Sequence, residues 1–231
     1  MTKFYFDKDA ANKAIGFIEQ FITHTKGELS GKKLKLEDWQ KEIVGNIFGW
    51  KDKKTNLRKF RTVFIEVPRK NGKSTLCAAI GLYMLFADEE RGSEVYSAAG
   101  DRQQAGIVFE IAKGMILQSP ELSQRGKVFR NSIVNESKGN FYQAISADSK
   151  TKHGFNANCI IFDELHTQQN RDLWDVLVTS TGSRRQPLTI AITTAGYDKQ
   201  SICYEIYSYA KKVQDGTIKD DSFYSVIYES E

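Results

Sequence analysis

Val67-Pro68-Arg69-Lys70-Asn71-Gly72-Lys73-Ser74-Thr75 is the stretch that decides the fold of this 231-residue chain. A short apolar segment, residues 62–67, leads into it, and a longer apolar segment with helical character, residues 74–87, follows at once. A strand, a tight turn and Gly-Lys-Ser at the start of a helix form the layout in which backbone N–H groups enclose a phosphate. The stretch therefore predicts a phosphate-binding loop at the carboxyl end of a strand.

The residue types of this loop point to a nucleotide with a bound magnesium ion. Lys73 is expected to reach the β- and γ-phosphate oxygens, and the Ser74 hydroxyl to bind Mg²⁺. The usual P-loop pattern has a glycine five positions before Gly72, where this chain has Val67, so the match is incomplete. The residues predicted to contact ATP here are Arg69, Lys70, Asn71, Gly72, Lys73, Ser74 and Thr75.

A pair of acids ends a second apolar strand, residues 158–162. In Cys159-Ile160-Ile161-Phe162-Asp163-Glu164, alternation along the extended chain turns the two carboxylates to different sides. Such a site needs one carboxylate for the metal and another to orient or deprotonate the attacking water. We therefore expect Asp163 to hold Mg²⁺ and Glu164 to activate water.

Two further polar groups are expected at the same site. The strand at residues 188–193 ends in Thr193 and Thr194, whose hydroxyls could sense the γ-phosphate and pass its presence to the following helix. Gln40 begins a helix ahead of the first strand, and its amide can pair with both a donor and an acceptor on an adenine edge. Cations near predicted strand ends could complete charge neutralisation in the transition state. They are Arg69, Arg102 and those of the 150–154 stretch.

The rest of the chain alternates short and long apolar segments after a helical beginning. Helical spacing at 10–24 and 37–50 predicts a helical segment over residues 1–58. A charged loop, 51–59, precedes the change to short apolar segments. Further strands are predicted at 94–99, 140–146 and 188–193, and further helices at 102–118, 172–180 and 201–213. This alternation predicts an α/β domain with a central, mainly parallel sheet flanked by helices.

Composition excludes several classes of protein. Lys and Arg exceed Asp and Glu by 33 − 29 = +4, which permits contact with nucleic acid without predicting it. The longest apolar run, about a dozen residues, is too short for a membrane span. The three cysteines are far apart and odd in number, which indicates neither a disulfide framework nor a zinc site. We expect an intracellular, reducing location.

With these residues in place, the chain resembles the amino-terminal ATPase domain of the large terminase subunit of tailed double-stranded DNA bacteriophages. The likeness extends from Trp39-Gln40 to Gly196. The motifs that carry it are Arg-Lys-Asn-Gly-Lys-Ser at 69–74, Ala98-Ala99 before Asp101-Arg102-Gln103-Gln104-Ala105, Ser146-Ala147-Asp148 with His153-Gly154, Phe162-Asp163-Glu164-Leu165-His166, and Thr193-Thr194-Ala195-Gly196.

The resemblance implies a P-loop NTPase fold of the RecA-like, ASCE type and an ATP-driven motor that moves viral DNA into a procapsid. By position, Gln40 would contact adenine, Arg69 the γ-phosphate, and Glu164 the water, while Thr193 and Thr194 would couple hydrolysis to movement. The implied cofactor is Mg²⁺ with ATP. The implied partners are double-stranded DNA, further copies in a ring of five on the portal protein, and the small terminase subunit, in the host cytoplasm without a membrane.

Two expectations concern what completes the site. Relatives place an arginine before the glycine that precedes the acidic strand, where it reaches a neighbouring subunit's ATP. Here that position is His153, with Lys152 before it, so Lys152, His153 and Arg102 are the candidate fingers. The family also has an RNase H-like nuclease domain at its carboxyl end. Residues 1–231 are expected to be the ATPase domain alone, and Asp220, Asp221, Glu229 and Glu231 to lie in a tail.

Two alternatives stay open at this point. Asp163-Glu164-Leu165-His166 also matches the Asp-Glu-x-His box of superfamily-two helicases and translocases, although these usually carry Gly-x-Gly-Lys-Thr in the phosphate loop. The chain could also be a DNA-binding or assembly module that binds nucleotide without hydrolysing it. Retention of Glu164 speaks against that second alternative, since a site without hydrolysis has no need of this acid.

Overall fold

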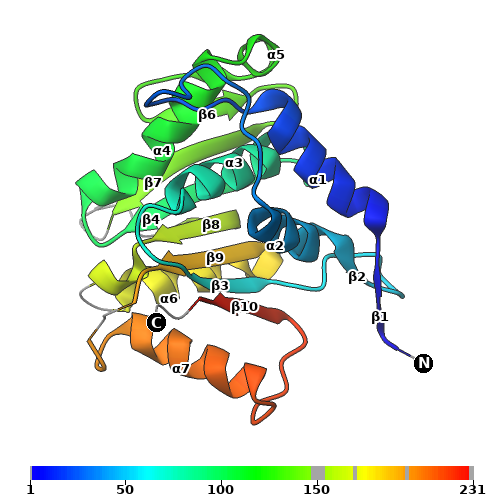
Figure 1. Ribbon diagram of the computed structural model, residues 1–231. Coiled ribbons are helices and arrows are strands. Elements are labelled where there is room, and N and C mark those ends of the chain that lie inside the picture. Colours follow the sequence, from blue (N-terminus) through cyan, green and yellow to red (C-terminus); the bar gives the residue numbers. More distant parts are fainter. Residues whose placement is uncertain (1, 147–153, 169–170, 196–197, 229–231) are drawn as a thin grey trace.

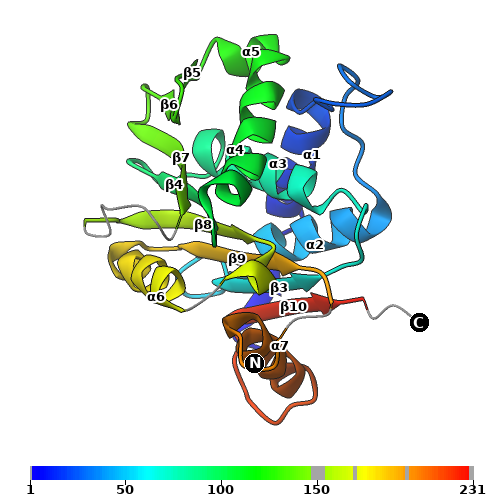
Figure 2. The same ribbon diagram turned by 90° about the vertical axis from the view of Figure 1, so that its left-hand side faces the viewer.

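The computed structural model describes residues 2–146, 154–168, 171–195 and 198–228. They form a central sheet covered by helices on both faces (Figures 1 and 2). The strands are β1 (Phe4–Phe6), β2 (Trp50–Asp52), β3 (Thr62–Glu66), β4 (Glu94–Ala99), β5 (Lys127–Val128), β6 (Ser132–Asn135), β7 (Asn140–Ser146), β8 (Ala157–Asp163), β9 (Leu188–Thr193) and β10 (Phe223–Ile227). The helices are α1 (Lys8–Phe21), α2 (Asp38–Gly49), α3 (Lys73–Phe86), α4 (Arg102–Leu117), α5 (Pro120–Ser123), α6 (Asp172–Thr179) and α7 (Ile202–Gln214), with 3₁₀ turns η1 (Leu165–Thr167) and η2 (Ser180–Ser183).

The main sheet has the order β10-β3-β9-β8-β4-β7-β6-β5. Strands from β10 to β7 pair in parallel, and β6 and β5 extend the sheet antiparallel. β1 and β2 form a separate antiparallel ribbon. The predicted α/β fold with a mainly parallel sheet is confirmed, and every strand and helix predicted from the sequence is present with small differences at its ends.

Alternation along the strands divides the core between the two faces of the sheet. On β3, Val63 and Ile65 join a buried cluster with α1, α2, α3 and α4, whereas Phe64 between them joins a second cluster with α6 and α7. Figure 2 shows these two helix layers on opposite faces. Because both faces are covered, strands such as β8 are apolar at successive positions, as parallel strands commonly are.

Side-chain caps define where several helices begin. Asp7 accepts a hydrogen bond from the Ala10 N–H at the start of α1, and Asp101 accepts one from the Gln104 N–H at the start of α4. Each cap pairs a backbone donor that the helix itself leaves free. No helix in the described part of the chain is long and apolar enough to cross a membrane.

β10 corrects the expectation of a carboxyl-terminal tail. Asp220 and Asp221 lie just before it, and Phe223–Ile227 pairs with Thr62–Glu66 of β3 in parallel, so this segment is the outer strand of the sheet. Asp220 caps its start by accepting hydrogen bonds from the Ser222 N–H and hydroxyl. Glu229 and Glu231 lie outside the described residues. β10 therefore covers the edge of the strand that leads into the phosphate loop.

The hydrogen bonds of β10 predict which backbone positions tolerate proline. The Tyr228 N–H donates to Glu66 O, and Ser222 O accepts from the Arg61 and Thr62 N–H groups. The backbone N–H and C=O groups of even-numbered residues in β10 therefore point towards β3. We expect Val226→Pro to lower the free energy of unfolding by about 3 kcal/mol, because it removes a bond to β3. The measurement is urea denaturation.

Ser225→Pro is the matched control, because odd-numbered residues face the open edge, where Ser225 O accepts from the Gln214 side chain. Proline is tolerated on the solvent side of an edge strand, so this variant should stay within about 1 kcal/mol of the parent. Equal losses in the two variants would contradict the pairing.

Candidate nucleotide-binding site

The sheet order brings three strand ends with polar side chains to one edge. β9 lies between β3 and β8, with Thr193 beside Glu66 of β3 and Ile192 beside Asp163 of β8. All three strands run parallel, so their carboxyl ends meet at the same edge. The phosphate loop, the acidic pair and the threonine pair, which are far apart in the sequence, therefore converge there.

The phosphate loop turns without the missing glycine. Val67 is buried, and its N–H donates to Thr193 O at 3.2 Å, so it continues the pairing of β3 with β9. The turn comes later, where Lys70 and Gly72 both have a left-handed φ of 69°. The Asn71 side-chain amide donates to Pro68 O at 3.1 Å and closes the loop. Valine fits at position 67 because the chain is still a buried strand there.

Two short contacts join the phosphate loop to the acidic pair. The ammonium of Lys73 lies 2.7 Å from Glu164 Oε1, with side-chain exposures of 8% and 23%. The Ser74 hydroxyl donates to Asp163 Oδ2 at 2.8 Å. The predicted metal residues, Ser74 and Asp163, are thus neighbours, and so are the predicted phosphate residue and the predicted water-activating acid. The site therefore pairs its own opposite charges, Lys73 with Glu164.

The acidic pair carries backbone strain and a shifted pKa. Glu164 has φ 51° and ψ 53°, a left-handed conformation that is uncommon outside glycine and clusters at functional sites. Its N–H donates to Asp163 Oδ1 at 3.1 Å. Burial raises the pKa of Asp163, and the nearby Glu164 adds to this, while the Ser74 hydroxyl and the Lys73 ammonium oppose it.

A histidine that the sequence analysis gave no role links the acidic pair to the threonines. His166 Nδ1 lies 2.9 Å from Thr193 Oγ1 and 3.3 Å from Glu164 Oε2. Cys203 of α7 also contacts Thr193, with its Sγ 3.6 Å from the hydroxyl oxygen. In the sequence, the Asp-Glu-x-His motif was the signal that could have pointed to His166. Both predicted coupling residues, Thr193 and Thr194, are buried at this edge.

Gln40, the predicted adenine contact, lies beside the phosphate loop, and its amide is partly engaged. Its Oε1 accepts from the Glu37 N–H at 3.0 Å as part of a capping box that begins α2. Its Nε2 faces Gly72, at 3.8 Å from the point where a Cβ there would sit. A cavity of about 480 Å³ opens between α2 and the loop, lined by Leu36, Trp39, Gln40, Lys70, Gly72 and Thr75 among others.

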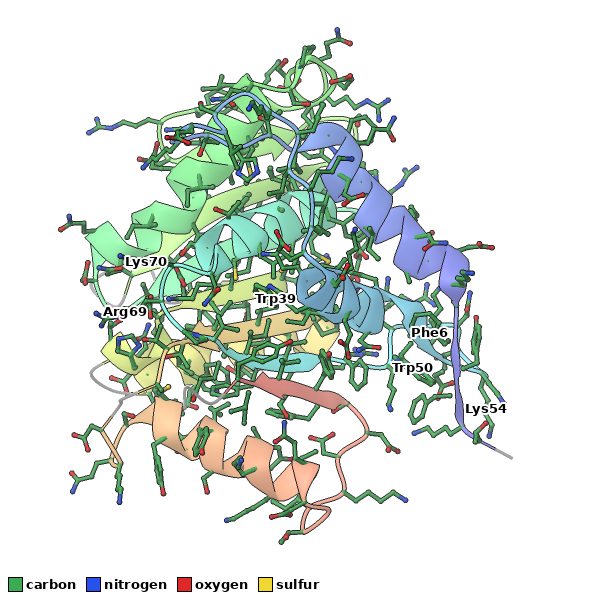
Figure 3. All side chains as sticks on the ribbon, in the orientation of Figure 1. Phe6, Trp39, Trp50, Lys54, Arg69 and Lys70 are labelled. Atoms are coloured by element: carbon green, nitrogen blue, oxygen red, sulfur yellow. The ribbon has the colours of Figure 1, made fainter. Side chains whose placement is uncertain are left out.

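The remaining predicted residues differ in what the structure says of them. Arg69 and Lys70 are exposed at the loop, at the end of the molecule opposite Phe6, Trp50 and Lys54 (Figure 3). Arg102 is the first residue of α4, which starts after the carboxyl end of β4. Lys152 and His153 lie outside the described residues. The structure therefore brings together the loop, the acids, the threonines and Gln40, and leaves the finger unassigned.

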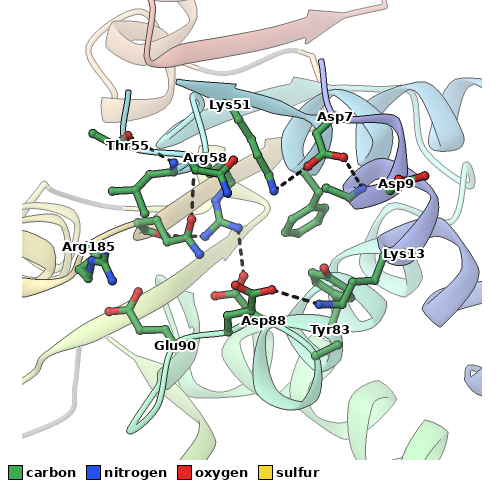
Figure 4. A pocket seen from close by; sticks show the side chains of 17 residues that line it. Asp7, Asp9, Lys13, Lys51, Thr55, Arg58, Tyr83, Asp88, Glu90 and Arg185 are labelled. Carbon is green, nitrogen blue, oxygen red and sulfur yellow. Dashed lines mark hydrogen bonds and ion pairs between the residues drawn. The ribbon is translucent and has the colours of Figure 1, made fainter. Parts of the chain in front are cut away.

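A second cavity, of about 450 Å³, is separate from this site and holds none of the predicted residues (Figure 4). Its centre is the buried ion pair of Arg58 with Asp88, at 3.2 Å. This pair connects the 51–59 loop to the end of α3. Arg58 also donates hydrogen bonds to Gln186, which precedes β9. Within the described residues, no group of three His, Cys, Asp or Glu side chains is placed to hold a metal ion.

The raised pKa of Asp163 predicts a gain in stability on neutralising it. The folded state favours the protonated acid, so its charge destabilises the fold above the folded pKa, and this penalty is lost as the pH falls through that value. We expect Asp163→Asn to raise the melting temperature at pH 7 by about 2 °C or more without added metal. The difference from the parent should shrink towards pH 4.

The control is Asp215→Asn, on an exposed acid whose pKa is lowered mainly by the Thr217 hydroxyl. This variant should show no gain at pH 7. Calorimetry of both variants across the pH range makes the comparison, and an Asp163→Asn protein no more stable than the parent at pH 7 would contradict the burial argument.

Comparisons with known proteins place the chain in a family. The profile of the family "Terminase large subunit, ATPase domain" matches residues 38–212. The large terminase subunit of Enterobacteria phage HK97 is 32% identical over an alignment of 193 residues, and the match covers 79% of this chain and 36% of that protein. The chain thus spans about a third of the length of this curated relative.

Solved structures show the same fold. The crystal structure of the HK97 large terminase has a TM-score of 0.80 at 24% identity and covers 96% of this chain and 44% of that one. A large terminase ATPase domain of Thermus phage P74-26 has a TM-score of 0.64 at 15% identity and covers 97% and 86%. The fold is therefore that of a P-loop NTPase of the RecA-like, ASCE type, and the chain belongs to the terminase large subunit ATPase domain family.

Proposed function

We propose that residues 1–231 are the ATP-hydrolysing motor domain of a phage large terminase, which drives double-stranded DNA into a procapsid. In this proposal residues 1–58 form the helical segment that supplies Gln40 to the adenine. The observation that carries it is the pairing of Lys73 with Glu164 and of Ser74 with Asp163, at 2.7 and 2.8 Å. These four side chains are the ones that ATP hydrolysis needs, and they already touch one another.

The residues present fit a magnesium ion. Mg²⁺ takes oxygen ligands, and the Ser74 hydroxyl and the Asp163 carboxylate put two such oxygens side by side. Ser74 and Asp163 would hold the ion, which supplies charge neutralisation to the β- and γ-phosphates when bound. Burial raises the pKa of Asp163, and a cation bound beside this carboxylate would lower it again.

The side chains of the site act in a definite order in this mechanism. In this mechanism the phosphates attract Lys73 away from Glu164, because they carry more negative charge than a single carboxylate. The carboxylate of Glu164, freed from its cation, is then available to orient the attacking water. Arg69 lies exposed at the loop, where it can approach the γ-phosphate. Gln40 reads the adenine edge with its free Nε2 and the second lone pair of its Oε1.

The rest of the proposal concerns the parent protein and its partners. We propose that copies assemble in a ring of five on the portal protein, with the small terminase subunit bringing the DNA, and that a nuclease domain lies elsewhere in the parent. A motor that moves along any sequence should contact phosphates, so its DNA affinity should fall steeply with salt. The helicase alternative finds no support in the comparisons.

Glu164→Gln is the test of the chemistry. It removes the base and the partner of Lys73 while keeping the shape of the side chain, so turnover should fall about 10²- to 10⁴-fold. ATP should bind as well or better, by up to about tenfold, because Lys73 is no longer held by a carboxylate. Mg²⁺-dependent phosphate release and nucleotide-binding fluorescence measure the two effects.

Glu136→Gln is the matched control, because Glu136 forms an exposed pair with Lys127 away from the site. It should leave both measurements unchanged. If the parent binds ATP and shows no Glu164-dependent turnover, even as the full-length protein with double-stranded DNA, the chain is a nucleotide-binding module and the proposed function is wrong.

A further inference from the structure

His166 is placed between the water-activating acid and the coupling threonine. It lies in η1, directly after the strained Glu164, and its side chain is 23% exposed. Its Nδ1 is within 3.3 Å of both Glu164 Oε2 and Thr193 Oγ1. One ring nitrogen thus has two oxygen partners, one on each side of the site.

The hydrogen bonds around Thr193 show which partner this nitrogen has in the resting state. The Thr193 hydroxyl donates its proton to Thr194 O at 3.1 Å. Its oxygen can then only accept from His166 Nδ1, so the proton of the neutral ring is assigned to Nδ1 by this network. Burial lowers the pKa of His166, and the Lys73 and Arg69 charges lower it further, whereas the Glu164 charge raises it. The net lowering favours the neutral ring.

The carboxylate of Glu164 is left half-satisfied by this arrangement. Of the described residues, Lys73 and His166 are those that contact it, Lys73 at Oε1 and His166 near Oε2. Oε2 is buried and accepts no hydrogen bond from the described residues, although Nδ1 is only 3.3 Å away, because the N–H points to Thr193. A buried oxygen without a hydrogen-bond donor raises the free energy of the protein. A movement that brings a donor to Oε2 is therefore favourable.

The backbone of Glu164 cannot easily make that movement. Its carbonyl oxygen accepts from the Thr167 N–H at 2.8 Å and from the Thr167 hydroxyl at 2.9 Å. The same turn is packed against Gly100, where an added Cβ would lie 2.6 Å from Thr167 O. The turn is therefore fixed, and a small rotation of the His166 ring is the change that brings a donor to Oε2.

We propose that His166 is a positioning residue that exchanges partners during the ATPase cycle. In the resting state its Nδ1–H bonds Thr193, and when ATP takes Lys73 from Glu164, the same N–H turns to Glu164 Oε2 and holds the carboxylate for the attacking water. The Thr193 hydroxyl oxygen, which also accepts from the Cys203 thiol of α7, loses the His166 donor at that moment. This inference rests on the proposed function and adds a residue to it.

The test compares His166→Asn with His166→Leu. The amide nitrogen of asparagine occupies the place of Nδ1 and keeps a donor, whereas leucine keeps the volume and removes it. We expect His166→Leu to lower kcat about 10- to 100-fold, as a misplaced catalytic group does, with ATP affinity within about threefold of the parent. His166→Asn should recover most of the lost kcat. Nucleotide affinity shows that both variants are folded.

A double variant separates this inference from the proposed function. If His166 acts through Glu164, adding His166→Leu to Glu164→Gln should cause no further loss. Equal kcat in His166→Leu and His166→Asn, whether both match the parent or both are impaired, would overturn the inference, and so would a full further loss in the double variant. The proposed function fails on a different result, namely full turnover in Glu164→Gln alone.

Discussion

The ion pair of Lys73 with Glu164 joins the two halves of the site, and much of the surrounding structure serves to form it. Lys73 is almost fully buried at the start of α3, which follows β3, and Glu164 directly follows β8, two strands from β3. A buried lysine needs an oppositely charged partner, and two adjacent carboxylates need a nearby cation. β9 sets the distance between the loop and the acids by pairing with β3 on one side and β8 on the other.

In this arrangement ATP and its metal ion replace existing contacts of Lys73 and Ser74 rather than binding to unpaired side chains. Lys73 and Ser74, which phosphate and metal require, are already paired with Glu164 and Asp163. Binding of ATP therefore exchanges one set of charge pairs for another. The Glu164 carboxylate becomes available only after Lys73 has moved to the phosphates. The same logic keeps the acid restrained when no nucleotide is bound. Function and stability oppose each other at Asp163, whose buried charge costs stability.

The sequence predicted the parts of the fold that local pattern determines. Strands buried on both faces, such as β8, and the strand–loop–helix around Gly72 are visible in the order of residues. β10 was missed because a five-residue edge strand, buried at Phe223 and half-buried at its other positions, shows no alternation of buried and exposed residues. Arg58 was placed in a charged loop because its buried partner, Asp88, is distant in sequence and only the folded chain joins them.

The site was predictable to a similar degree and for similar reasons. Residue type and spacing pointed to Ser74, Asp163 and Glu164, whereas the link from His166 to Thr193 depends on strand order, which spacing does not reveal. Gln40 was expected to offer its whole amide, but the capping box of α2 engages Oε1.

The most direct test of the account is a crystal structure with Mg²⁺ and a non-hydrolysable ATP analogue. The account predicts Lys73 on a phosphate oxygen and no longer on Glu164, with the adenine beside Gln40. A nucleotide bound in this site with the Lys73–Glu164 pair still at 2.7 Å, or bound instead in the cavity around Arg58, would contradict it.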